Sequence, residues 1–146
     1  MEIVLVVLAL AAGVGLPVQT GVNAAFARYA GRPEWAAFVN FAVGLVALAA
    51  WLFALRLAPP TGLAVSRAPW WSWAGGILGA FYVSAITFLA PRLGVAVTLG
   101  LAVGGQMIAA LALDQVGALG LAHRPMTPSR VAGAALLVVA VVLIRR

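Results

Sequence analysis

The sequence predicts an all-α integral membrane protein with five transmembrane helices. Of its 146 residues, 65% are hydrophobic and only 8% are charged, whereas about a quarter of a soluble domain is charged. The charged residues stand at the ends of long uncharged stretches, most of them close to the roughly 20 residues that cross a bilayer. Glycine and proline mark the connections between these stretches. We therefore expect a single transmembrane domain that covers residues 1–146.

The uncharged stretches place the helices in order. The last stretch, Val131–Ile144, is shorter than the others. It gains length if Pro128 occupies the first turn and Arg130 extends its side chain to the interface. The expected helices are approximately Ile3–Arg28, Trp35–Leu57, Trp70–Pro91, Leu93–Leu113 and Pro128–Ile144.

The first predicted helix carries the richest set of polar residues. Pro17 cannot donate to the carbonyl of Gly13, which predicts a kink or break near the middle of the helix. Gln19 and Asn23 are four residues apart and share a face. They form either a substrate site at a broken helix or structural hydrogen bonds between helices. Asn40, near the start of the second helix, is close enough to bond Asn23, and a structural role is expected for it.

Small residues open the third predicted helix. Gly75, Gly76 and Gly79 permit close approach of another backbone, so we expect them to serve helix packing. Tyr82 lies near the middle of the membrane and needs a hydrogen-bond partner. It either lines a cavity or bonds a neighbouring helix.

The fourth predicted helix repeats the pattern of the first. Gly104 and Gly105 weaken it near mid-membrane, and the amide of Gln106 follows directly. A weak point followed by an amide again favours a position on a transport pathway.

The acidic residues all lie at the ends of predicted spans. Asp114 ends the fourth span, where it is either a gate or coupling residue or a solvated helix end. Because spans alternate in direction, Arg67 and Arg130 share its side of the membrane. We expect Asp114 to pair with one of these arginines, since an unpaired carboxylate at a span end is costly when partly buried.

Several function classes find no support in the sequence. The nine arginines do not follow one helix face, which argues against nucleic-acid binding. There is no cysteine, and His123 is the lone histidine, so no converging set of metal ligands is visible. We expect no catalytic residue, no metal, no cofactor and no enzymatic activity.

Four segments together resemble the YdcZ-like family of inner-membrane exporters, within the drug/metabolite transporter superfamily. They are Leu16-Pro17-x-Gln19-x3-Asn23, Trp71-x-Trp73-x-Gly75-Gly76-x2-Gly79-Ala80, Gly105-Gln106 with Asp114, and Arg130-x2-Gly133. The resemblance implies a bacterial five-helix inner-membrane protein with a transport role, and relatives that form antiparallel dimers or fused ten-helix chains. The positions that match the pattern are Gln19, Asn23, Gly75, Gly76, Gln106 and Asp114. The superfamily's smallest members use a membrane-embedded glutamate in their first helix. This chain lacks it, so a proton-antiport mechanism does not carry over.

The expected function is transport of a small molecule, as an exporter that alternates access in a homodimer. Gln19, Asn23, Tyr82 and Gln106 are expected to line the pathway, and Asp114 to gate or couple it. An uncharged amide-lined path suits polar neutral, zwitterionic or lipid-like substrates. The expected partners are the bilayer, a second copy of the chain and a small-molecule substrate. A channel-like pore and a non-transporting subunit that packs with a partner remain alternatives.

The arginines also bear on orientation. Five spans would place Arg56, Arg67, Arg124 and Arg130 on one side of the membrane, and Arg28, Arg32, Arg92, Arg145 and Arg146 on the other. Orientation follows an excess of positive residues in short cytoplasmic loops. A split of four to five leaves almost no excess on either side. We therefore expect insertion in both orientations and an antiparallel, ten-helix homodimer, a one-gene version of an inverted repeat.

Overall fold

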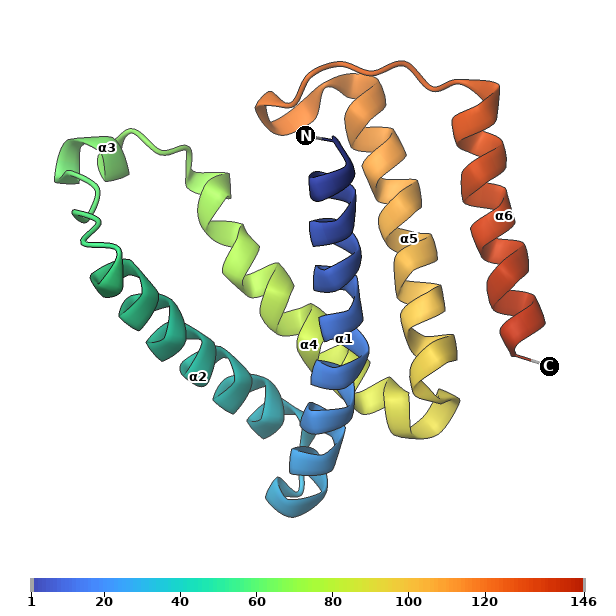
Figure 1. Ribbon diagram of the computed structural model, residues 1–146, viewed down its shortest axis with the longest axis horizontal. Helices are drawn as coiled ribbons and strands as arrows, with labels where there is room; N and C mark the ends of the chain where they lie inside the picture. Colours follow the sequence, from blue (N-terminus) through green and yellow to red (C-terminus); the bar gives the residue numbers. More distant parts are fainter. Residues whose placement is uncertain (1, 146) are drawn as a thin grey trace. The chain divides into compact units, whose positions relative to one another are not determined.

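The computed structural model describes residues 2–145, and every regular element among them is a helix (Figure 1). Contacts between Cα atoms divide the chain into two compact units that meet at Leu89 and Ala90. Residues up to Leu89 form the first unit, and residues from Ala90 onward form the second. The prediction of an all-α membrane protein is confirmed. A single transmembrane domain and a dimeric assembly stay predictions.

Within residues 2–145, four helical segments are long and apolar enough to cross a membrane. They contain α1 (Glu2–Ala30), α2 (Pro33–Ala54), the 3-10 turn η1 (Trp70–Trp73) followed by α4 (Ala74–Leu93), and α5 (Val95–Val116). The fifth predicted span is α6 (Pro128–Ile144), which has the predicted ends but only 17 residues. Two short elements lie in the predicted connections: α3 (Gly62–Ser66) and the 3-10 turn η2 (Ala118–Gly120).

The helix ends follow from local chemistry. Pro33 occupies the first turn of α2, where its missing N–H costs nothing, so the helix starts earlier than predicted. Gly94 separates α4 from α5 with a φ of +85°, a conformation that only glycine adopts readily. Gly117 ends α5 in the left-handed conformation, and its N–H bonds the carbonyls of Asp114 and Leu113.

The predicted weak points do not interrupt their helices. α1 continues through Pro17 from Glu2 to Ala30, so of the two predicted alternatives the break is wrong, and the kink stays a prediction. A single proline removes one backbone hydrogen bond, and the remaining i to i−4 bonds hold the helix together. In the same way, α5 continues through Gly104 and Gly105.

In each unit, a glycine lies close to a side chain of a neighbouring helix. In the first unit, a Cβ at Gly79 of α4 would lie 3.2 Å from the ring of Phe41 in α2. In the second unit, α5 and α6 form a hairpin, and a Cβ at Gly100 would lie 2.8 Å from a methyl carbon of Val141. At Gly75, Gly76, Gly104 and Gly105, no atom in the described part of the chain lies within 4 Å of such a Cβ. Gly75, Gly76 and Gly105 are exposed and leave their helix faces open, whereas Gly104 is buried beside the hollow between α5 and α6.

Candidate functional site

The predicted pathway residues of the first unit line one narrow cleft between α1 and α4. Gln19 and Asn23 come from α1, and Tyr82 comes from α4. The cleft measures about 10 Å³, which is the room that one water molecule needs. The full lining is Leu16, Gln19, Thr20, Asn23, Tyr82, Val83, Ile86 and Thr87. None of these residues is charged, so the cleft is a polar but neutral place between two candidate spans.

Two threonines supply the most buried polar groups of this cleft. Thr20 is 5% exposed, and its hydroxyl donates to the carbonyl of Leu16 at 2.8 Å. Its proton is therefore engaged, and only its lone pairs face other groups. Thr87 is 2% exposed, and its Oγ1 has no hydrogen-bond partner among residues 2–145. A buried hydroxyl without a partner costs about 1–3 kcal/mol. A ligand or a water molecule that bonds Thr87 would remove this cost.

Gln19 connects this cleft to a second hollow, the groove between α1 and α2. Its Nε2 donates to Oδ1 of Asn40 at 2.9 Å. The expectation that Asn40 bonds Asn23 is thus wrong about the partner: the longer Gln19 side chain reaches α2, while Asn23 is buried and lines the α1–α4 cleft. The groove measures about 490 Å³ and is lined by Gln19, Asn40, Phe41, Val43, Gly44, Leu45 and Leu48.

The remaining predicted site residues lie in the second unit. Gln106 is exposed on α5. Gly104 and Gly105 contribute to an apolar hollow of about 230 Å³ between α5 and α6, together with Gly100, Leu101, Ile108, Val138, Val141 and Val142. The structure therefore assembles Gln19, Asn23 and Tyr82, and it assigns Gln106 to a different unit. Their role in transport stays a prediction.

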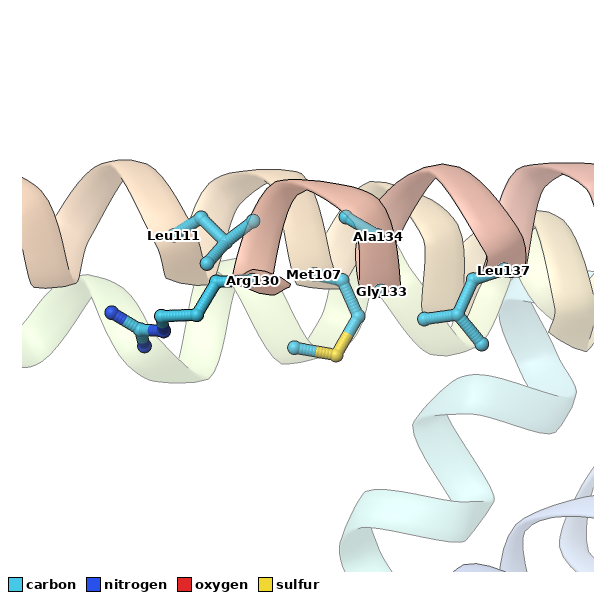
Figure 2. A pocket seen from close by; sticks show the side chains of 6 residues that line it. All are labelled: Met107, Leu111, Arg130, Gly133, Ala134 and Leu137. Atoms are coloured by element: carbon cyan, nitrogen blue, oxygen red, sulfur yellow. The ribbon is translucent and has the colours of Figure 1, made fainter. Parts of the chain in front are cut away.

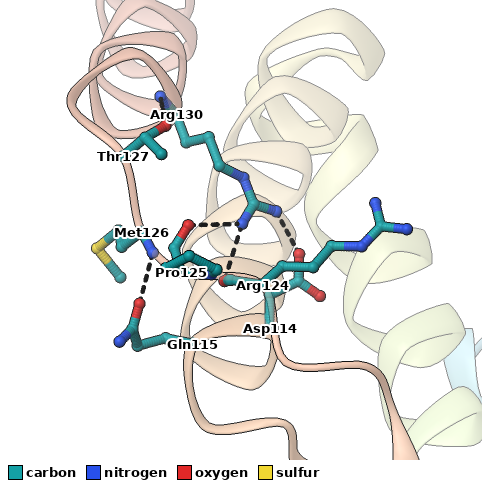
Figure 3. A network of polar contacts seen from close by, with 7 residues as sticks. All are labelled: Asp114, Gln115, Arg124, Pro125, Met126, Thr127 and Arg130. Atoms are coloured by element: carbon teal, nitrogen blue, oxygen red, sulfur yellow. Dashed lines mark hydrogen bonds and ion pairs between the residues drawn. The ribbon is translucent and has the colours of Figure 1, made fainter.

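Asp114 pairs with Arg130, one of the two predicted partners (Figure 3). The side chains are 26% and 31% exposed, respectively. The same guanidinium donates to the carbonyls of Arg124 and Pro125 at 3.1 and 3.4 Å. The N–H of Arg124 in turn donates to the carbonyl of Asp114 at 2.8 Å. One arginine thus fastens the α5–α6 connection to the end of α5.

Neighbouring contacts complete this network at the loop end of the hairpin. Gln115 accepts a hydrogen bond from the N–H of Met126 (Figure 3). Thr127 caps α6 by accepting from the N–H of Arg130 at 3.4 Å. Arg130 also lines an apolar hollow of about 330 Å³. In Figure 2, Arg130 stands at one end of the row of lining side chains and Leu137 at the other. The rest of its lining is Met107, Leu111, Gly133 and Ala134.

Sequence reasoning missed Thr20 and Thr87 as members of the cleft. A weak signal was present, because Thr20 lies three residues before Asn23 and therefore near its face. Thr87 lies inside a predicted span, four residues before its end, and each polar side chain within a span needs a reason. Threonine is easily overlooked there, since its hydroxyl often bonds the carbonyl four residues earlier within its own helix.

Comparisons with known proteins agree with this architecture. Residues 4–143 match the model of a family described as "Putative inner membrane exporter, YdcZ". The chain is 31% identical over 137 residues to the inner membrane protein YdcZ of Escherichia coli, an alignment that covers 94% of this chain and 91% of that protein. No solved structure matches the chain. The apolar helices and this relative establish a multi-pass protein of the inner membrane. On this evidence the chain belongs to the YdcZ family of inner-membrane proteins.

Proposed function

We propose that the protein exports uncharged polar or amphipathic small molecules by alternating access, along a pathway that passes the α1–α4 cleft. The observation that carries this proposal is the gathering of Gln19, Thr20, Asn23, Tyr82 and Thr87 around one space between two candidate spans. Polar side chains inside a membrane are costly, and they commonly mark substrate pathways. The membership of an exporter family supports the same conclusion.

The absence of charge around the cleft limits the substrate. A charged group that enters an apolar membrane interior must be paired, because its desolvation is otherwise prohibitive. The residues lining the α1–α4 cleft offer hydroxyl and amide groups alone. Substrates whose entering group is uncharged therefore suit this site better than bare cations or anions.

A second copy of the chain is part of the proposal. Five helices are few to enclose a pathway, and we take α6 to be the fifth span. Four arginines on one side and five on the other leave orientation nearly undecided. Two copies of opposite orientation then form an antiparallel homodimer with ten helices. The open faces at Gly75, Gly76 and Gly105 leave room for helices of that second copy.

The function is tested with purified protein in two steps. A thermal-shift screen against a metabolite library finds ligands, because any molecule that binds the folded state raises its stability. Each hit is then loaded into proteoliposomes, and its efflux is followed. A carrier shows saturable efflux and exchange between substrates, whereas a channel shows neither. If no hit leaves the liposomes faster than from protein-free ones, the export function is wrong.

Dual orientation has its own test. The chain has no natural cysteine, so a single cysteine added after Arg146 reports where the C-terminus lies. Labelled in intact cells by an impermeant thiol reagent, about half of the molecules should react. Labelling of nearly all or nearly none contradicts dual insertion. Two arginines added to the connection at residues 59–62 should shift the mixture strongly toward one orientation.

A further inference from the structure

We propose that the exported molecules are amphipathic alcohols. Their uncharged hydroxyl group would enter the cleft between α1 and α4, and their apolar body would lie in the groove between α1 and α2. This inference rests on the proposed export function and specifies the chemistry of its substrate. Two observations carry it: the hydrogen-bonding state of Thr20 and Thr87, and the position of Gln19 at both hollows.

The hydrogen-bonding state of the cleft matches a hydroxyl group. Thr20 has given its proton to the carbonyl of Leu16, so its Oγ1 accepts a further hydrogen bond and cannot donate one. Thr87 Oγ1 has no partner among residues 2–145, so its proton is available to donate. A ligand hydroxyl donates to the first oxygen and accepts from the second. The volume of about 10 Å³ fits one group of this size.

The groove beside the cleft fits an apolar body. Gln19 lines both hollows, so the proposed ligand, with its hydroxyl group in the cleft, would pass this side chain to place its apolar body in the α1–α2 groove. The groove holds about 490 Å³, within the range of small-molecule sites. Apart from Gln19 and Asn40, its lining consists of apolar residues and one glycine. A water molecule would occupy the cleft but would not contact the apolar lining of the groove.

Photolabelling tests this inference with octan-1-ol that carries a diazirine on its third carbon. On illumination the probe loses N2, and the carbene inserts into a nearby bond of the protein. Mass spectrometry of peptides from the purified full-length protein then locates the label. We expect labelling of the groove residues 41–48 in the wild type, and at least a tenfold loss in Thr87→Val. Thr87→Ser should retain most of it, because it keeps the hydroxyl.

A matched control exists in the second unit. Thr98 is also 2% exposed, and its Oγ1 likewise has no partner among residues 2–145, but it does not line the cleft. Thr98→Val should therefore label like the wild type. Equal losses in Thr87→Val and Thr98→Val would indicate a general loss of structure and would overturn the proposal.

A second measurement uses the wild type alone, and so does not depend on a folded variant. Unlabelled octan-1-ol should compete for labelling at least tenfold better than heptyl methyl ether, its isomer without an O–H donor. Equal competition means that the groove takes any apolar chain, including lipid, and the alcohol inference fails. Saturable efflux of a non-alcohol from proteoliposomes would still support export in that case. The two failures are therefore distinguishable.

Discussion

The two units of the chain differ in where their polar side chains gather. In the first unit, the buried polar residues Thr20, Asn23 and Thr87 lie between helices. In the second unit, Thr98 is buried within α5, the polar contacts of Asp114 and Arg130 lie at the end of the hairpin, and the hollow beside Gly100 and Val141 is apolar. Polar groups that fasten a loop serve the fold. Polar groups between spans are costly in a membrane, and the first unit gathers several of them around one cleft, so this contrast teaches that the first unit is the place to look for a substrate.

The largest expected effect tests the first unit. Replacing Asn23 by Leu, a side chain of similar size, removes the amide from the cleft. We expect efflux of a screened substrate to fall about 100-fold, which corresponds to about 2.7 kcal/mol, while thermal stability changes little. The matched control is Val18→Leu on the exposed side of α1, which should transport normally. Normal efflux by Asn23→Leu would remove the cleft from the pathway.

The next effect tests packing in the second unit. In Gly100→Ala the new methyl group would meet Val141 at 2.8 Å, and relief of such overpacking costs about 1–3 kcal/mol. Gly104→Ala meets nothing within 4 Å in the described chain, so it should leave the stability of the single chain unchanged or raise it. Thermal unfolding of both variants makes the comparison. A loss of stability in Gly104→Ala as large as that in Gly100→Ala would contradict the assignment of the close α5–α6 contact to Gly100.

A smaller effect is expected at the loop end. Asp114→Asn removes the ion pair with Arg130 but leaves the two carbonyl acceptors of that arginine in place. Because both side chains are partly exposed, we expect a loss of about 1 kcal/mol in stability and unchanged efflux. Reduced efflux at unchanged stability would instead assign Asp114 a gating or coupling role.

The smallest effect concerns access of water to the first unit. Single cysteines at Gln19 and Asn23 should react several-fold faster with a small water-soluble thiol reagent than a cysteine at Val18, which is 63% exposed and would face lipid. Reaction rates of the purified variants in liposomes provide the measurement. Equal inertness at the three positions argues that the cleft is dry.

The helices were largely predictable, whereas the partners of their side chains were not. Charges at span ends and turn residues placed four long helices within a few residues and α6 at its observed bounds. The sequence left open whether Pro17 kinks or breaks α1; the helix continues because intact neighbouring hydrogen bonds outweigh the one that proline removes. Two contacts depend on which helix faces meet in space. Asn40 bonds Gln19 and not Asn23, and Thr87 lines the cleft. A single sequence does not encode that visibly.

The length of α6 has a consequence for the surrounding lipid. Its 17 residues span about 25 Å at 1.5 Å per residue, less than the roughly 30 Å of a typical hydrocarbon core. The 29 residues of α1 span about 43 Å by the same rise. A short helix thins the bilayer around it, and a long one tilts. If α6 crosses the membrane, hydrophobic mismatch makes this protein sensitive to acyl-chain length, with the least strain around α6 in thin bilayers.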